Sequence, residues 1–107
     1  MPSFPRVTYP LGVKDKDAVL DWGFDWNDPD AVGGPWLEAG ETLTTSQWIV
    51  PDDPDGIVVD SDTHTDTTTT VWLSGGTVNT VYLVTNRITT TGGRTDDRSW
   101  EIKVVDR

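Results

Sequence analysis

The chain has 107 residues, of which 35% are hydrophobic, and it contains six Trp and no Cys. This length suits one ordinary domain, and without cysteine there is neither a disulfide nor a Cys-based metal site. The formal net charge of −10 disfavours nucleic acid and anionic membranes as partners, because both would repel the chain.

Residues 1–17 are expected to form an extended N-terminal arm. They include Pro2, Pro5 and Pro10, which oppose both helix formation and strand pairing. Such an arm could lie on a neighbouring subunit, or it could be a floppy terminus. The segment has no continuous hydrophobic stretch, so we expect no signal peptide, and the chain has no apolar run of transmembrane length.

Residues 18–26 alternate between large apolar and small or acidic side chains, with Leu20, Trp22, Phe24 and Trp26 on one face. A period of two predicts a half-buried strand. The rings could instead form an exposed platform for a sugar or a cation. We interpret them as core residues, because exposing three rings would leave so small a domain too little to bury.

Further strands follow, separated by segments rich in Asp, Pro and Gly. The segment "NDPDAVGGPW" predicts a loop, which is the commonest place for an interaction site on a β scaffold. The expected strands cover residues 41–50, 57–66, 67–76, 77–91 and 95–106. Short strands at this spacing, with no credible helix, predict an all-β fold. We expect an immunoglobulin-like antiparallel β-sandwich of about seven strands over residues 18–107.

Tyr82 follows the Gly75–Gly76 turn and begins the longest expected strand. This placement is typical of a tyrosine corner, in which the phenol bonds to backbone a few residues upstream. An ordinary inward-facing Tyr is the alternative.

Catalysis has a single candidate base, His64, which lies between Asp62 and Asp66. A neighbouring carboxylate could orient this imidazole. No nucleophile motif or Gly-rich phosphate loop accompanies it, and we therefore expect no enzymatic activity.

A calcium loop is suggested by "PDDPDGIVVDSD", where Asp53, Asp55 and Gly56 fit the EF-hand pattern. Pro51 at the first place and Asp62 at the twelfth do not fit, and no helices flank the loop. We expect no metal and no cofactor, although an irregular calcium site between Asp-rich loops stays open as an alternative.

The remaining Trp residues divide into two groups. Trp48 and Trp100 are expected, like Trp22 and Trp26, on an inward face or its rim. Trp36 and Trp72 are expected to be exposed, where they could stack on a sugar or pack against a neighbouring subunit. We favour the subunit contact.

Two segments resemble a set of small tailed-bacteriophage proteins called fiber-tail adaptor proteins. Residues 70–99 carry "VWLSGGT", "VTNRITT" and "GRTDDRS" in an order and spacing that match this group. The earlier "KDKDAVLDWGFDW" looks like the group's opening, DPADVLDYxxDW. The chain departs from the group in a longer Pro- and Gly-rich insert near residues 27–40 and in its more acidic ends.

The resemblance implies a non-enzymatic structural component of the virion, with an immunoglobulin-like fold and attachment between tail and fibres. It would be made in the host bacterial cytoplasm. Partners would be other tail, fibre or capsid subunits, bound by several symmetric copies. Decoration of the capsid head is one alternative, and a glycan- or calcium-binding module is another. The expected contact residues are Phe4, Tyr9, Trp36, Trp72, Arg94 and Arg98, with the two arginines bridging to acidic partners.

Overall fold

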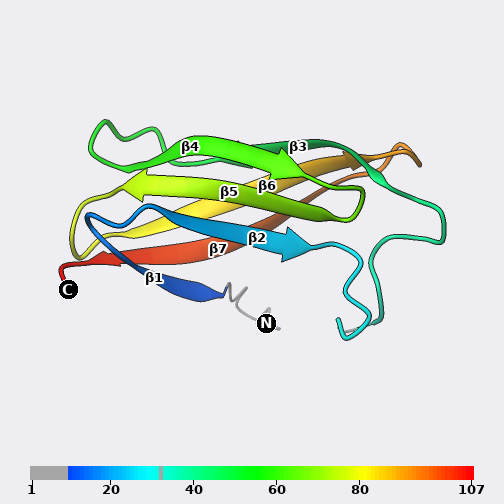
Figure 1. The fold of residues 1–107 in the computed structure, drawn as a ribbon, viewed down its shortest axis with the longest axis horizontal. Coiled ribbons are helices and arrows are strands. Elements are labelled where there is room, and N and C mark those ends of the chain that lie inside the picture. Colours follow the sequence, from blue (N-terminus) through cyan, green and yellow to red (C-terminus); the bar gives the residue numbers. More distant parts are fainter. Residues whose placement is uncertain (1–9, 32) are drawn as a thin grey trace, which may run out of the picture.

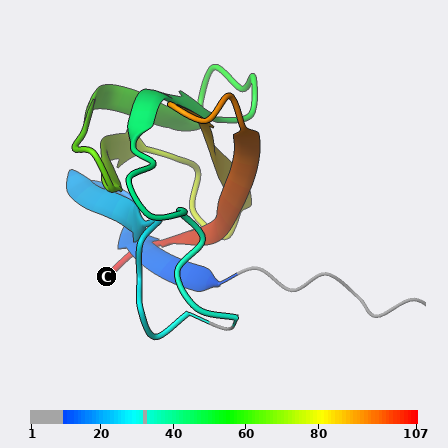
Figure 2. The same cartoon turned by 90° about the vertical axis from the view of Figure 1, so that its right-hand side faces the viewer.

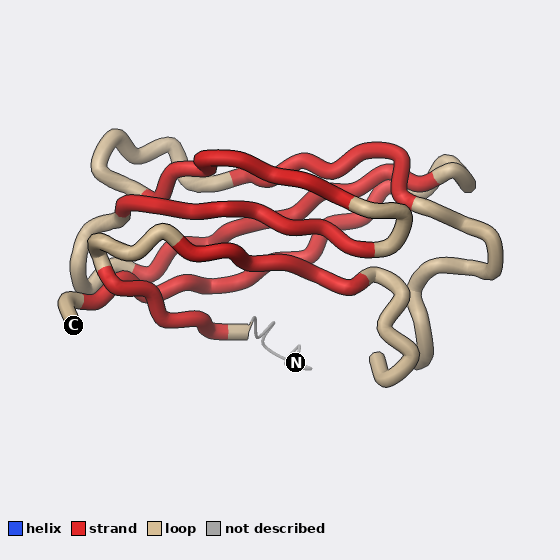
Figure 3. Tube along the Cα trace, in the orientation of Figure 1, coloured by secondary structure: helices blue, strands red, loops and turns tan. Residues whose placement is uncertain are grey.

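The structure is a computed structural model that describes residues 10–31 and 33–107. These residues form seven β-strands and no helix (Figures 1 and 3). Accordingly, no helix capable of crossing a membrane is found among them. The strands are β1 (Leu11–Asp15), β2 (Leu20–Asp25), β3 (Leu43–Ile49), β4 (Ile57–His64), β5 (Thr68–Gly75), β6 (Val81–Thr90) and β7 (Thr95–Val105).

The strands form two sheets, with orders β1-β7-β6-β3 and β2-β5-β4, packed face to face as Figure 2 shows. Every neighbouring pair is antiparallel except β1 and β7, which run parallel. Both orders are compatible with the immunoglobulin fold, in which the second, fifth and fourth strands form one sheet and the third, sixth and seventh the other. The predicted all-β sandwich is confirmed.

The structure differs from the expected N-terminal arm over Leu11–Asp15, which pairs with β7 as strand β1. Two residues of β1 explain this close packing. Gly12 lies against the Trp22 indole, where a Cβ would overlap the ring. Lys14 is buried, and its ammonium donates to the carbonyls of Asp15 (2.8 Å) and Gly75 (2.9 Å). Residues 1–9 of the expected arm lie outside the described residues.

The rings of β2 and of the residue that follows it point into the sandwich, as the alternation predicts. Trp26 is fully buried, while Trp22 and Phe24 are half-buried and pack against the core. Phe24 stacks on Trp48 at 5.9 Å and on Trp100 at 4.2 Å between ring centroids. Leu20, which begins this edge strand, is 39% exposed, so the inward face starts at Trp22, two residues later than expected.

Tyr82 forms the predicted tyrosine corner. Its side chain is buried, and its hydroxyl oxygen accepts a hydrogen bond of 2.8 Å from the backbone N–H of Thr77. This bond ties the turn after β5 to the start of β6, and both sheets meet at that corner.

Candidate protein-contact surfaces

The loop between β2 and β3 projects from one end of the sandwich, at the right in Figure 1. Arg94, just before β7, contacts the second half of this loop at Trp36 and Glu41. The guanidinium forms a two-pronged ion pair with Glu41 and donates to the Trp36 carbonyl at 3.1 Å. It also lies 4.0 Å from the centroid of the Trp36 ring. The loop is therefore fixed to the β6–β7 turn by ionic, polar and cation–π contacts.

The contacts of Arg94 with Glu41 and Trp36, which we call the Arg94 clamp, can be tested through the pKa of Glu41. The Arg94 guanidinium, helped by the Glu38 N–H and the Thr90 hydroxyl, lowers the pKa of Glu41 from 4.5 to about 2. The ionised carboxylate therefore stabilises the fold fully above about pH 4.5, and this contribution is lost as the pH falls through about 2. We expect a carbon-13 NMR titration of the Glu41 carboxyl to give a midpoint near 2 in the native chain. A midpoint near the ordinary 4.5 would contradict the clamp.

Arg98 is also engaged within the chain. Its guanidinium lies 4.1 Å from the centroid of the buried Trp26 ring and donates to the Asp25 carbonyl at 3.3 Å. Burial lowers the pKa of Arg98. Trp26 in turn meets Trp36 edge-on at 5.2 Å. Arg94 and Arg98 thus orient the loop through the rings of Trp36 and Trp26. The expected contacts of both arginines with acidic partners stay predictions.

Several of the acidic residues in the turns shape the backbone. The carboxylates of Asp15, Asp25, Asp28 and Asp53 each accept a hydrogen bond from the N–H two residues later. This is the Asx-turn arrangement. Over residues 10–31 and 33–107, no group of three His, Asp or Glu side chains is placed to hold a metal ion.

His64 lies exposed at the end of β4. Its Nδ1 donates to the carbonyl of the adjacent Thr65 at 3.0 Å. In the described part of the chain, this carbonyl takes the place of the carboxylate that the sequence suggested as the partner of His64.

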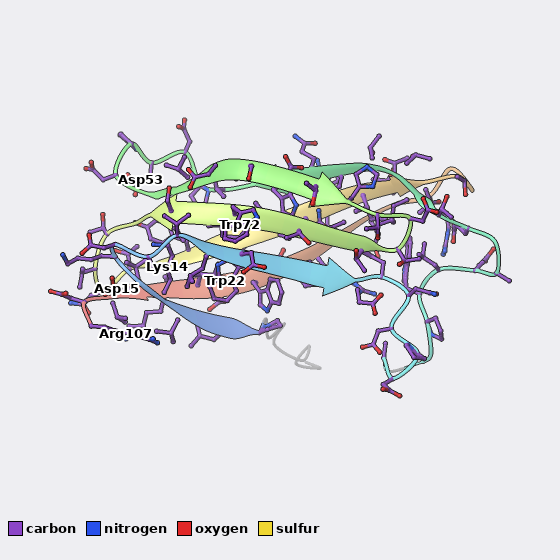
Figure 4. The ribbon with its side chains drawn as sticks, viewed as in Figure 1. Lys14, Asp15, Trp22, Asp53, Trp72 and Arg107 are labelled. Carbon is purple, nitrogen blue, oxygen red and sulfur yellow. The ribbon has the colours of Figure 1, made fainter. Side chains whose placement is uncertain are left out.

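The outer face of the β2-β5-β4 sheet carries an apolar patch, the Trp72 patch, made of Val19, Val58 and Trp72. Trp72 is 42% exposed and lies on β5 at the centre of the sheet (Figure 4). Val58 pairs with Ser74, two residues along β5 from Trp72 and on the same face. Val19 immediately precedes β2 and is also exposed. A ring at the centre of a sheet face, with aliphatic neighbours, fits a protein contact.

The outer face of the other sheet carries a second apolar patch, the Leu83 patch. Its members are the exposed Leu11 and Val13 of β1 and Val81 and Leu83 of β6. Leu11 and Leu83 both pair with Glu101 of β7, and Val13 and Val81 both pair with Lys103. Four aliphatic side chains thus flank one acidic and one basic residue, on the opposite side of the sandwich from Trp72.

The expected contact residues therefore fall in different places. Trp72 is exposed on a sheet face, as expected, whereas Trp36 is half-buried under Arg94. Phe4 and Tyr9 lie outside the described residues. The Leu83 patch was not expected, although the run Val81-Tyr82-Leu83-Val84 signals it, because a strand with apolar residues at successive positions presents them to both faces.

A known protein family matches most of the chain. No curated protein matches the chain. Residues 14–103 match the family described as podophage GP4 fiber-tail adaptor protein gp77, a span that includes β2 to β6 and most of β7. This chain is accordingly a structural component of the phage virion, a member of the podophage GP4 fiber-tail adaptor (gp77) family.

Proposed function

We propose that the chain joins tail to fibre by presenting the Trp72 patch to one partner protein and the Leu83 patch to another. The observation that carries this proposal is the placement of two exposed apolar patches on opposite outer faces of one sandwich. A protein with a single binding face could attach to a particle, but two opposed faces allow it to lie between two components.

The surrounding charge supports selective contacts. A net charge of −10 keeps free copies apart and soluble. Apolar patches bordered by Asp21 and Asp60 on one face, and by Glu101 and Lys103 on the other, favour partners whose surfaces complement those charges. When several copies bind together, individually weak contacts add through multivalency.

The clamped loop supplies a third contact in this proposal. Arg94 and Arg98 act as positioning residues that hold Trp36 and the loop backbone in one arrangement. A loop ordered before binding loses less conformational entropy when a partner docks.

The two-face arrangement predicts that substitutions on the two faces separate the partners. We expect Trp72→Ala and Leu83→Ala each to weaken binding by at least about tenfold, but to different virion components. Because both side chains are exposed, the free energy of unfolding should change by no more than about 0.5 kcal/mol for Leu83→Ala and little more for Trp72→Ala. Binding of each variant to purified tail and fibre components, measured by biolayer interferometry, tests this.

Asp62→Ala is the matched control, because Asp62 is exposed on β4 and belongs to neither patch. It should bind both components as the native chain does. If Trp72→Ala and Leu83→Ala weaken binding to the same component, or to neither, the two-face arrangement is wrong.

A further inference from the structure

Strand β7 has an open edge over half of its length. It pairs with β6 from Thr95 to Lys103, but with β1 only from Glu101 to Val105. Within the part of the chain that the structure describes, Thr95–Trp100 therefore has a strand neighbour on one side only. Figure 1 shows β1 running along only part of β7. An exposed strand edge offers unpaired N–H and C=O groups that can bind another strand.

Pro10 lies immediately before β1 and limits its pairing with β7. Its carbonyl accepts from the Glu101 N–H at 2.9 Å, so its nitrogen faces β7 at the position that would donate to the Ser99 carbonyl. Proline has no N–H to donate. Continued pairing of the same strand is thus interrupted where the open edge begins.

The surroundings of the open edge suit an added strand. A shallow recess of about 440 Å³, lined by Arg87 of β6 and by Thr95, Asp96 and Asp97, lies over the β6–β7 pair at this end of β7. On the inner side, Trp100 meets Trp22 edge-on at 5.9 Å. The Trp22 Nε1 is buried with no hydrogen-bond acceptor among the described residues. The edge therefore combines main-chain groups with an aromatic seam, formed by Trp22 and Trp100.

Residues 6–9 of this chain have the matching chemistry. The segment Arg-Val-Thr-Tyr lies between Pro5 and Pro10, so it offers four residues free of proline, similar in length to the open edge. Val7 and Tyr9 alternate with Arg6 and Thr8, as in a strand with one apolar face. Arg6 is the single charged side chain in residues 1–9, which makes this segment basic in a chain of net charge −10.

The register favours the segment of another copy over that of the same copy. Gly12 and Lys14 of β1 face the interior. A strand continued in this register would turn Arg6 and Thr8 inward and Val7 and Tyr9 to solvent. A one-residue shift reverses the faces, and a segment that comes from a second copy is free to take it. Val7 and Tyr9 would then face the aromatic seam.

We propose that residues 6–9 of a second copy of this chain add as a β-strand to the open edge of β7 at Thr95–Ser99. The inference rests on the proposed role as an assembly subunit, since it links neighbouring copies. Binding of this kind gains affinity from main-chain hydrogen bonds and specificity from alternate side chains.

Thiol cross-linking between full-length chains tests this, because the native chain has no Cys. One chain carries Val7→Cys and the other Thr95→Cys, and a short bismaleimide is added to their mixture. Thr63→Cys, on β4 of the other sheet, is the control for Thr95→Cys, since both threonines are exposed and lie in strands. We expect linked heterodimers with Thr95→Cys in about tenfold higher yield than with Thr63→Cys.

Adding Tyr9→Pro to the Val7→Cys chain should reduce the yield to the control level, because in this register the Tyr9 N–H points toward β7 and proline removes it. Equal yields with Thr95→Cys and Thr63→Cys would overturn the proposal. So would an internally linked monomer as the main product of a chain carrying both Val7→Cys and Thr95→Cys, because the chain's own segment would then fill the edge. Binding of the native chain to tail and fibre components separately reports the proposed function.

Discussion

Asn86→Ala is expected to lower the free energy of unfolding by about 3–4 kcal/mol, because it removes a buried, fully bonded amide from between the sheets. The Asn86 carbonyl accepts from the Trp26 Nε1 (3.1 Å) and from the Thr69 hydroxyl (2.8 Å). Its amide donates to the Ser46 hydroxyl (2.9 Å) and the Gln47 carbonyl (3.2 Å). Alanine would leave at least two buried donors without an acceptor and would create a cavity.

Urea unfolding followed by tryptophan fluorescence measures this effect. Arg87→Ala is the matched control, since Arg87 is the next residue on β6 and forms an exposed ion pair with Asp97 at 2.8 Å. Such a pair contributes at most about 1 kcal/mol. If Asn86→Ala costs no more than Arg87→Ala, the amide does not join the sheets as the distances indicate.

Gly23→Ala is expected to cost about 2–3 kcal/mol, because the added methyl would overlap the Thr69 backbone carbonyl on β5. Relief requires β2 and β5 to separate, and a paired backbone cannot move as a flexible side chain does. The overlap should also loosen the rings that β2 places in the core.

Asp21→Ala is the control for Gly23→Ala, because Asp21 is exposed, lies on β2 and is two residues away on the same face. It should change the free energy of unfolding by no more than about 0.5 kcal/mol. Thermal unfolding monitored by near-ultraviolet circular dichroism compares the two. Equal stabilities for the two variants would show that the strands tolerate the methyl group at position 23.

Local pattern was sufficient to predict much of the fold. The alternation of Trp22, Phe24 and Trp26 predicted an inward face, and the Gly-rich turn before Tyr82 predicted the corner. Both signals act within a few residues, where sequence distance and spatial distance are nearly the same. The parallel pairing of β1 with β7 was not predicted, because it depends on residues about ninety positions apart and on Gly12 fitting under the Trp22 ring.

The polar contacts were harder to predict for the same reason. Asn86 shares the alternating positions of the buried Tyr82, Val84 and Ile88, which indicates an inward position, but its partners come from three other segments. Arg94 was expected to face a partner protein. Glu41, whose side chain is only 6% exposed, is its intramolecular partner, and nothing near Arg94 in sequence points to a residue in the loop before β3.

The family match defines the class of protein, whereas the structure suggests which surfaces it uses. Trp72 alternates with Val71 and Leu73, both of which are buried, and this alternation explains why its exposure could be expected from the sequence. The Leu83 patch could not be predicted without knowing that β1 and β6 both pair with β7, since its four members come from two strands that do not touch each other.

The position of this chain in the intact particle tests its role as a bridge most directly. An image reconstruction of the virion should show its density between tail and fibre, with Trp72 facing one component and Leu83 facing the other. Density for the chain on the head surface, or at the tail with both faces bare, would contradict the account.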